Sequence, residues 1–558
     1  MLSFKLLPVL VASAVLSVAT IASAAVSAVI PAAQALGMQD LGPLGAATPV
    51  RIAVLVRYQH EAELEQLVGA QADPSSPMYH HFVSEAQFRS YFSPTVSEYA
   101  LAVSALRRAG FTIAGEYPNR TLVDAIAPAF TVERTFATQL HRFEQPGGGV
   151  GYANVSPATI PATMPYVKGI AGLDNRSASA PAVAHTAGAQ PAFSGDAQLI
   201  GPDGGFSPHV SRRAYDFPGP HGFDGTGVRV GEIAQGYLYA SDLATFLAEF
   251  GITRKGPPPT VVPVDGPCNI TEACSLYDSE TDVEWLSALA PGADIYLYQV
   301  NNTTDFAVGA LDGYNRVVSD NFVDVVNITN EYSICEALEV NLVLLQNEIF
   351  EQGSATGMTF VSNAQSCQAP YTNLPTEPAD SPGVLGVTES TLFTDAHGNR
   401  VAETALLSEG GGVSALEPAP PEQLAIKGVN RSGRNAPDIA TALFANGTGR
   451  SEYARTPAGS APRWIGGAFI PETNNAAVAD MVAEWVQMSG GRLGAVDLTL
   501  YDIFAANGYS DAKGPLFDDI TSGCIGTYDG KAICARPGYD VATGIGAPDG
   551  FDLGMALR

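Results

Sequence analysis

Three acidic side chains with helical spacing could supply acid–base chemistry in this chain. Asp278, Glu280 and Asp282 lie at the start of a segment, 280–289, whose residue pattern predicts a helix. Asp278 and Asp282 are four positions apart and would share one face of that helix, whereas Glu280 would point elsewhere. Neighbouring carboxyl groups can hold and transfer a proton, as general acid–base catalysis requires. Alternatively, the three carboxylates simply complement the positive N-terminus of the helix dipole.

The overall composition excludes several other kinds of chemistry. The eight His residues include no pair at the spacing H-x-x-x-H, so a His-based zinc hydrolase is disfavoured. The chain has 29 Lys and Arg against 57 Asp and Glu, a formal net charge of −28, which repels phosphate backbones. Nucleic-acid binding is therefore not expected. Hydrophobic residues make up 46% and charged residues 15%, which is typical of a core-forming chain rather than a disordered one.

The N-terminus has the residue order of a secretory signal peptide. Lys5 is followed by an apolar run, 6–21, and then by small residues that end at Ala24. A membrane anchor is the alternative, but the run is short for a span and is interrupted by polar residues. We therefore expect residues 1–24 to be removed. The mature chain should be secreted, extracellular or periplasmic, with no membrane contact once the signal is gone.

The cysteines of an exported chain are expected to form disulfides. Proximity along the chain favours three pairs, although other connectivities stay open: Cys268 with Cys274, Cys335 with Cys367, and Cys524 with Cys534. The first and third pairs would close short loops. They should therefore fix local structure more than they raise global stability.

Residues 25–175 have the pattern of a separate α+β domain. Strands are expected at 50–58, 111–116 and 121–126, and helices at 60–72, 95–110 and 132–139. The second helix has strong end signals, because Thr95 and Glu98 have the spacing of a capping box and Gly110 follows two arginines. The element order is that of a ferredoxin-like β-α-β-β-α-β sandwich.

A linker and a second, larger domain follow. Residues 176–212 are rich in Ala, Ser, Pro and Gly with little periodicity, which predicts a linker that a protease could cut. Over 213–558, strands alternate with helices of about ten residues, which predicts a doubly wound parallel sheet covered on both faces. The expected strands are 227–237, 294–300, 323–328 and 358–362, and the expected helices are 242–250, 280–289, 306–318 and 339–351. Catalysis in such folds lies at the carboxyl ends of the strands.

Motifs in both domains resemble those of the sedolisin family, the serine-carboxyl peptidases. The N-terminal motifs resemble its activation propeptide and are DPSSP (73–77), NRTL (119–122) and GLDN (172–175). The later motifs resemble its subtilisin-like peptidase domain and are APGA (290–293), GGGVS (410–414), PDI (437–439), DITSG (519–523), PGYD (537–540) and TGIG (543–546). The resemblance implies a proprotein of a serine-type endopeptidase that hydrolyses peptide bonds in acid. It also implies a ferredoxin-like propeptide at 25–175 and a doubly wound α/β domain at 213–558.

The carboxylates expected from this family are only partly present. The resemblance implies a Glu base placed four residues before an orienting Asp, and Asp282 matches the orienting residue. The base position holds Asp278, which is shorter by one methylene, or about 1 Å of reach. In the family an Asp donates to the oxyanion from a Gly-Asp-x-Gly turn, and here Ser366 takes its place, with Asn363 as the nearby amide. Losing one such donor costs about 3 kcal/mol of transition-state stabilisation. The family's substrate-aligning strand end begins here at Asn327.

The position of the family's nucleophilic serine holds no serine. Aligned forward from Gly466, it falls on Phe469, and aligned back from Gly494, it falls on Glu472. The hydroxyl between these two alignments, that of Thr473, is β-branched and offset. Because covalent catalysis needs the nucleophile, we expect catalysis to be lost rather than slowed.

A calcium site is implied by the same resemblance. Its ligands would be two Asp side chains and three backbone carbonyls, from Asp519, Ile520, Arg536, Gly538 and Asp540. Five oxygens plus water suit this hard cation, and its role would be stability. The sequence thus predicts a secreted, calcium-binding, monomeric pseudopeptidase whose partners are a peptide or protein ligand and its own propeptide. The alternatives are an active acid endopeptidase and a structural protein that uses the scaffold only for bulk.

Overall fold

The computed structural model describes most of the chain in two packed units. The described residues are 29–30, 38–145, 149–176, 198–268, 278–301, 306–329, 334–336, 340–367, 373–407, 409–456, 459–465, 474–509 and 515–558. We call residues 38–176 the N-terminal unit and residues 198–558 the C-terminal unit. The predicted signal peptide and residues 177–197 of the predicted linker lie outside the described residues, as does Cys274.

The N-terminal unit is built on a four-stranded antiparallel sheet in the order β4-β5-β3-β9. Its elements are β3 (Pro49–Val56), α1 (Glu61–Ala72), α2 (Glu85–Tyr91), α3 (Val96–Ala109), β4 (Thr112–Glu116), β5 (Leu122–Pro128), α4 (Ala129–Phe136) and β9 (Val167–Ala171). This confirms the predicted ferredoxin-like order. Beside it lie the sheets β2-β6-β7 and β1-β8, which were not predicted: β1 (Val29–Ile30), β2 (Asp40–Pro43), β6 (Leu140–Gln145), β7 (Gly149–Asn154) and β8 (Ala158–Thr159).

Capping explains where the helices of this unit begin and end. Thr95 accepts a hydrogen bond from the backbone of Glu98, whose side chain returns to Thr95, and Gly110 ends α3 with a φ of 104°. Ser84 forms the same capping box in front of α2, a helix that the sequence prediction omitted. Helix α4 ends earlier than predicted, at Phe136, because Ala137 adopts a left-handed conformation with a φ of 52°.

Strand β3 contributes side chains to two different cores. Val50, Ile52, Val54 and Val56 pack in the core of the N-terminal unit. The side chains of the other face, including Ala53 and Leu55, pack in a core shared with the C-terminal unit. Alternate residues of a strand point to opposite faces, so the continuous apolar run reflects burial on both sides.

The C-terminal unit is built on an eight-stranded sheet in the order β11-β12-β10-β13-β15-β17-β18, with β21 also paired to β17. The pairings are parallel except β17 with β18. Its strands are β10 (Arg229–Ala234), β11 (Thr260–Val264), β12 (Asp294–Val300), β13 (Val325–Ile328), β15 (Thr359–Asn363), β17 (Val384–Thr394), β18 (Arg400–Ala405) and β21 (Ile439–Ala445). The expected doubly wound parallel sheet is confirmed, and every strand predicted for it is present.

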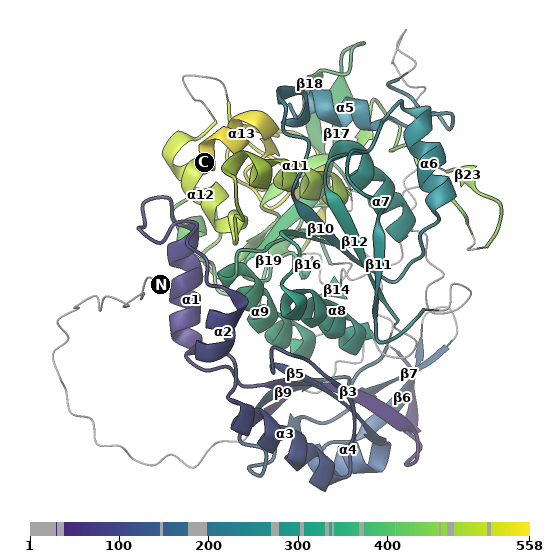
Figure 1. Ribbon diagram of the computed structural model, residues 1–558, viewed down its shortest axis with the longest axis vertical. Coiled ribbons are helices and arrows are strands. Elements are labelled where there is room, and N and C mark those ends of the chain that lie inside the picture. Colours follow the sequence, from purple (N-terminus) through teal and green to yellow (C-terminus); the bar gives the residue numbers. More distant parts are fainter. Residues whose placement is uncertain are drawn as a thin grey trace, which may run out of the picture.

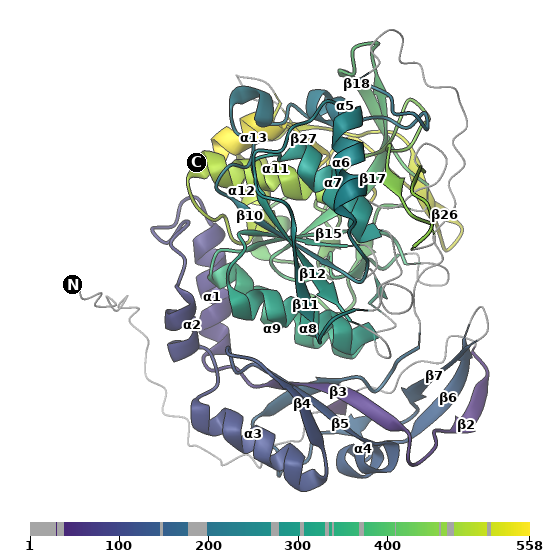
Figure 2. The same cartoon turned by 45° about the vertical axis from the view of Figure 1, so that its right-hand side comes forward.

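Helices cover both faces of this sheet. The helices are α5 (Pro208–Ala214), α6 (Ala240–Glu249), α7 (Asp278–Leu289), α8 (Phe306–Asp320), α9 (Val340–Ala355), α10 (Pro421–Leu424), α11 (Asn474–Ser489), α12 (Val496–Asn507) and α13 (Gly550–Ala556). Helices α7 and α11 pack together on one face, and α8 and α9 on the other. The sheet of the N-terminal unit packs against the outer side of α8 and α9, so the molecule is layered (Figures 1 and 2).

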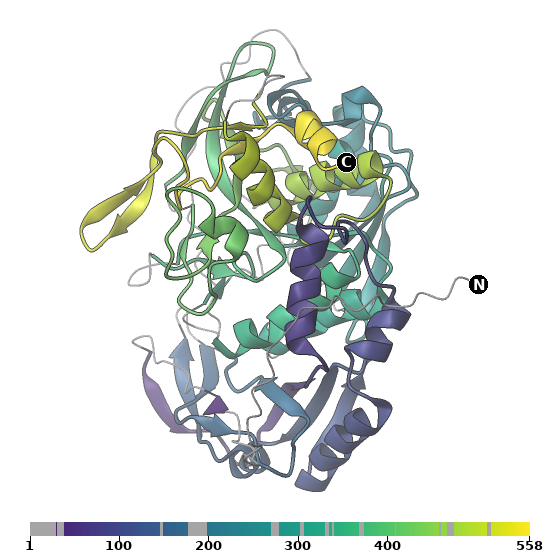
Figure 3. The ribbon, with the colours of Figure 1, turned by 90° about the vertical axis from the view of Figure 1, so that its left-hand side faces the viewer.

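Short two-stranded sheets complete the C-terminal unit. They are β14 (Ile334–Cys335) with β16 (Thr376–Glu377), β19 (Gly412–Val413) with β20 (Asn435–Ala436), β22 (Tyr453–Ala454) with β23 (Arg463–Trp464), β24 (Phe517–Asp518) with β27 (Ala547–Pro548), and β25 (Cys524–Tyr528) with β26 (Lys531–Cys534). The last pair forms the yellow hairpin that projects at the left of Figure 3. Two predicted disulfides, Cys335–Cys367 and Cys524–Cys534, are confirmed.

The end of the predicted linker is packed. Leu199, Phe206 and Val210 are fully buried, and α5 begins at Pro208. Residues 198–212 of the predicted linker therefore pack with the C-terminal unit, because apolar side chains separated by small residues are buried in its core. Among the described residues, no helix is both long and apolar enough to cross a membrane.

Candidate active site and the junction between the units

Helix α7 carries its acidic side chains into the interior. Glu280, Asp282 and Glu284 are at most 1% exposed, so they do not form a solvated first turn. The backbone N–H of Tyr239 donates to Glu280 Oε1 at 3.1 Å, and that of Tyr453 donates to Glu284 Oε2 at 3.0 Å. Burial raises the pKa of Glu280 to about 8 and that of Glu284 well above its usual range. Both groups therefore hold a proton in acid.

Glu280 and Asp282 face different neighbours, as their spacing predicted. The Asp242 carboxylate lies near Glu280 and is itself bound by Arg455, at 2.6 and 2.9 Å. Asp282 instead lies within electrostatic reach of the Arg450 guanidinium. The side chain of Asp278 lies outside the described part of the structure, so its predicted role stays a prediction.

Arg450 is a buried cation that the sequence analysis missed. It is 3% exposed, and its guanidinium lies 4.4 Å from the centre of the Trp285 ring. Nη2 donates to Asn474 Oδ1 and to the Ala442 carbonyl, each at 2.8 Å. Burial lowers the pKa of Arg450 to about 10, opposed by nearby acidic groups that include Asp282. An isolated Arg in a stretch of small and polar residues gives no periodic signal in the sequence.

Asn474 brings Arg450 to the start of α11. It is the first residue of that helix, its Nδ2 donates to the Thr388 carbonyl at 3.0 Å, and its Oδ1 accepts from Thr441 at 2.5 Å. The predicted nucleophile positions, Phe469 and Glu472, precede it and lie outside the described residues. Arg450 therefore contacts both α7, through Trp285, and the first residue of α11, which follows the predicted nucleophile segment.

The predicted oxyanion residues make contacts within the protein. Asn363 is the fully buried last residue of β15. The Ser366 hydroxyl is close to the carbonyls of Glu409 and Gly411, at 3.2 and 2.8 Å. Nδ2 of Asn327, at the predicted substrate-aligning strand end, donates to Glu232 Oε2 at 2.6 Å. A hydroxyl has one hydrogen, so Ser366 could donate to an oxyanion only by releasing a carbonyl.

The residues predicted to bind calcium lie in two segments, 519–520 and 536–540, on either side of the β25–β26 hairpin. Gly538 N–H donates to Asp519 Oδ2 at 2.9 Å, and Arg536 N–H donates to Asp540 Oδ2 at 2.7 Å. In the described part of the chain, no backbone N–H donates to the carbonyls of Ile520, Arg536 or Gly538. The bond from Gly538 to Asp519 joins the two segments, and within the described residues three of the predicted carbonyl oxygens accept no backbone hydrogen bond. This donor set fits a hard cation.

The N-terminal unit contacts α8 and α9 through the motif at 119–122. Nδ2 of Asn119 and the Thr121 hydroxyl donate to Asn315 Oδ1, at 2.7 and 2.9 Å, and both donors are buried. At the end of the unit, Gly172 has a φ of +93°, and a Cβ there would lie 2.9 Å from the Val308 side chain of α8. These motif residues therefore hold the two units together.

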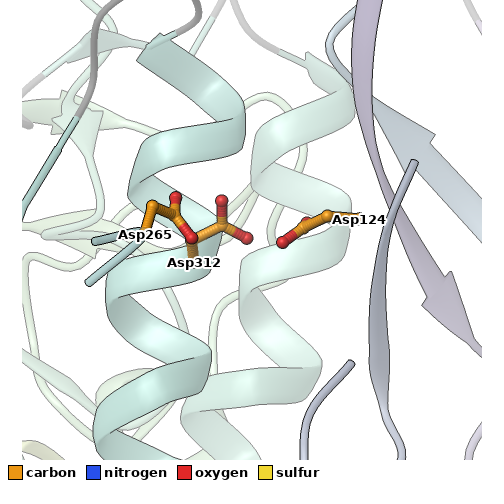
Figure 4. Close-up of side chains that lie close together, drawn as sticks. All are labelled: Asp124, Asp265 and Asp312. Atoms are coloured by element: carbon orange, nitrogen blue, oxygen red, sulfur yellow. The ribbon is translucent and has the colours of Figure 1, made fainter. Parts of the chain in front are cut away.

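An ion network extends the same junction. The Arg51 guanidinium contacts Asp312 at 2.6 Å, Asp265 at 2.8 Å and Asp124 at 3.3 Å. Figure 4 shows these carboxylates converging, with Asp124 reaching from the N-terminal unit toward the other two. Burial raises the pKa of Asp312 well above its usual range, and the neighbouring Asp124 and Asp265 raise it further. One cation thus faces three acidic groups.

Comparison with known proteins agrees with this arrangement. Residues 36–176 match the family model described as Pro-kumamolisin, activation domain. Sedolisin of Pseudomonas sp. (strain 101) is 26% identical over 541 residues, covering 92% of this chain and 88% of that protein. Kumamolisin of Bacillus sp. (strain MN-32) is 28% identical over 547 residues, covering 93% of each. The chain is a sedolisin-family proprotein.

A solved structure supports the fold of the sedolisin-type domain. It is that of Pseudomonas sedolisin, a serine-carboxyl proteinase complexed with two molecules of pseudo-iodotyrostatin. The match has a TM-score of 0.53 at 22% sequence identity and covers 63% of this chain and 98% of that chain. The subtilisin-like α/β fold predicted for the sedolisin-family domain is thereby confirmed.

Proposed function

We propose that this proprotein is a secreted, calcium-binding pseudopeptidase whose cleft binds peptides without cutting them. The observation that supports the proposal is the buried Arg450, which is bonded to the first residue of α11 and acts electrostatically on Glu389, Glu452 and Asp282. An acid-acting carboxyl pair has to share and transfer a proton. We propose that Asp282 instead serves as one counter-charge of this guanidinium, after Glu389 and Glu452, which is a structural role.

The sequence of the predicted nucleophile segment supports the same reading. Phe469 and Glu472, the two residues at the serine position in the alternative alignments, carry no hydroxyl or thiol. Without a nucleophile, no acyl-enzyme can form, whatever the state of the carboxylates. Binding can remain, because a cleft at the carboxyl ends of a parallel sheet does not depend on the reacting groups.

The partners we propose are a peptide or protein ligand and the proprotein's own propeptide, in a monomer. The junction formed by Arg51 and the motif at 119–122 supports the second partner. Calcium would bind Asp519 and Asp540 and the carbonyls of the turn, where it would fix the loop that carries the Cys524–Cys534 disulfide.

The test is peptide hydrolysis by the purified proprotein at pH 3 to 5. We expect no self-cleavage within 177–197 and no turnover of casein. Turnover that is lost in Asp282→Ala but kept in Glu280→Gln would overturn the proposal. Glu280→Gln is the matched control because it removes a buried carboxyl from the same helix, outside the predicted Asp278 and Asp282 pair. Circular dichroism of both variants separates loss of activity from loss of folding.

An active acid endopeptidase is the second candidate, and one observation favours it. Glu280 and Glu284 have raised pKa values because they are buried, so α7 still carries protonated carboxyl groups in the acid range. Glu284, which the Glu280→Gln control leaves intact, could then act as a general acid in a mechanism with another nucleophile. The same assay decides between the candidates, since this one requires turnover that rises as the pH falls below neutrality.

A further inference from the structure

A second group of three buried carboxyls lies next to the Cys335–Cys367 disulfide, and no predicted role uses it. Glu336 follows β14, Glu377 is in the paired strand β16, and Asp380 lies in the turn before β17. The three side chains are 1%, 0% and 0% exposed. One oxygen from each lies within 4.8 Å of the others. We call this set the β14–β16 carboxyl cluster.

Two of the three carboxyls are held by protein donors. Glu336 accepts from the Ser414 hydroxyl at 2.5 Å and from the Ala415 N–H at 2.8 Å. Glu377 Oε2 accepts from Gln346 Nε2 at 2.7 Å and from the Ser381 hydroxyl at 3.2 Å. These donors fix the geometry of the two groups and favour their charged forms.

Asp380 has no such support. Neither of its oxygens, nor Glu377 Oε1, accepts a hydrogen bond from a donor in the described part of the chain. Ser414 has a single hydrogen and gives it to Glu336, so it cannot also serve Asp380. A fully buried carboxyl that points into a group of acceptors is costly unless something satisfies it. Either a proton shared with the neighbouring Glu377 or a cation from outside the chain has to supply the missing partner, and the experiment below distinguishes the two.

Nearby charges do not balance the cluster. The guanidinium of Arg434 acts on Asp380, but it is already bound to Asp438 at 3.1 Å and lies 3.4 Å from Asp497. Burial raises the pKa of all three cluster carboxyls, which reflects the cost of holding them ionised together. The junction cluster of Asp124, Asp265 and Asp312 differs in this respect, because Arg51 fills its centre.

We propose that Glu336, Glu377 and Asp380 bind a calcium ion at a site separate from the turn at 519–540. Oxygens that ligate one calcium at about 2.3–2.6 Å lie at most about 5 Å apart, and the spacing in the cluster meets that limit. The donors are oxygens only, which favours a hard cation over zinc or copper. Magnesium keeps several waters and is less suited to a closed interior.

The ion would connect three segments around the predicted oxyanion loop. Glu336 directly follows β14 and Glu377 lies in the paired strand β16, while Ser414 directly follows β19. Ser366, at the predicted oxyanion position, is bonded to the Gly411 carbonyl just before β19. Calcium at the cluster would therefore stabilise β14, β16 and the start of the segment after β19, which are close to the predicted oxyanion position. This effect would add to any stabilisation by calcium bound at 519–540.

The experiment measures calcium in the full-length proprotein by mass spectrometry of the metal after gel filtration in metal-free buffer. We expect two calcium ions per chain in the wild type and one in Asp380→Asn. Asp540→Asn, the matched control in the C-terminal turn, should also retain one, and the double variant none. The same samples should show a melting temperature that rises when about 1 mM calcium is added, less so in each variant.

Two results would overturn this proposal. The first is an Asp380→Asn protein that retains as much calcium as the wild type. The second is an Asp540→Asn protein that retains no calcium, because protons rather than calcium would then occupy the β14–β16 carboxyl cluster. Retention of magnesium in place of calcium would overturn the choice of ion. If Asp380→Asn does not fold, Glu336→Gln takes its place in the comparison. Failure of the C-terminal site is recognised separately, because Asp540→Asn would then leave the calcium content unchanged.

Discussion

The Arg51 network offers a direct test of how the propeptide is held. Arg51→Met keeps the apolar stem of the side chain but removes the charge that faces Asp124, Asp265 and Asp312. Breaking a buried ion pair costs about 3–5 kcal/mol. Arg51 is 23% exposed, so we take a lower value of about 2–3 kcal/mol, which is roughly a 30- to 150-fold increase in opening of the junction.

The assay is the rate at which added thermolysin degrades the propeptide at pH 7.5, because cleavage of a transiently open state follows its population. Asp312→Asn is the matched control. It removes one of the excess negative charges while keeping the shape of the side chain, so degradation should not accelerate. The effect of Arg51→Met should become smaller as the pH falls, because burial raises the pKa of Asp312 and Asp124 and their protonation removes the charges that Arg51 faces. Equal rates for Arg51→Met and the wild type, or equal acceleration by both variants, would refute the reasoning.

Two further predictions concern stability. Thr95→Ala removes the oxygen that accepts from Glu98 N–H at 3.2 Å at the start of α3, which should cost about 1 kcal/mol. Urea unfolding of the N-terminal unit checks this, and an unchanged midpoint would contradict it. Glu280 has a folded pKa of about 8 against an ordinary value of 4.5, so the folded state binds the extra proton between these values. Wild-type stability should therefore fall as the pH rises from 5 to 8, by a few kcal/mol at most, and Glu280→Gln should be less sensitive. Urea midpoints at the two pH values measure the difference, and parallel changes in both proteins would disprove the assignment.

Local sequence signals identified the elements of this protein well. The capping box at Thr95, the glycine at 110 and the alternation of strands with helices depend on contacts between near neighbours in the chain. For that reason they could be recognised without the tertiary structure. The signal for α2 was equally local, since Ser84 and Gln87 form a capping box, and it could have been found. Two of the disulfide pairs followed from proximity alone.

The candidate site depended on contacts between distant residues. Arg450 packs over Trp285 of α7 and acts electrostatically on Asp282 only because the segment after β21 packs against α7. Glu336, Glu377 and Asp380 are unremarkable as separate acidic residues, and Arg51 reaches Asp312 across more than two hundred positions. The elements, the motifs and the residue types at the family positions can be recognised from the sequence alone. Which charges are buried together depends on tertiary packing, because the energy of a charge depends on the groups and the solvent that folding places around it.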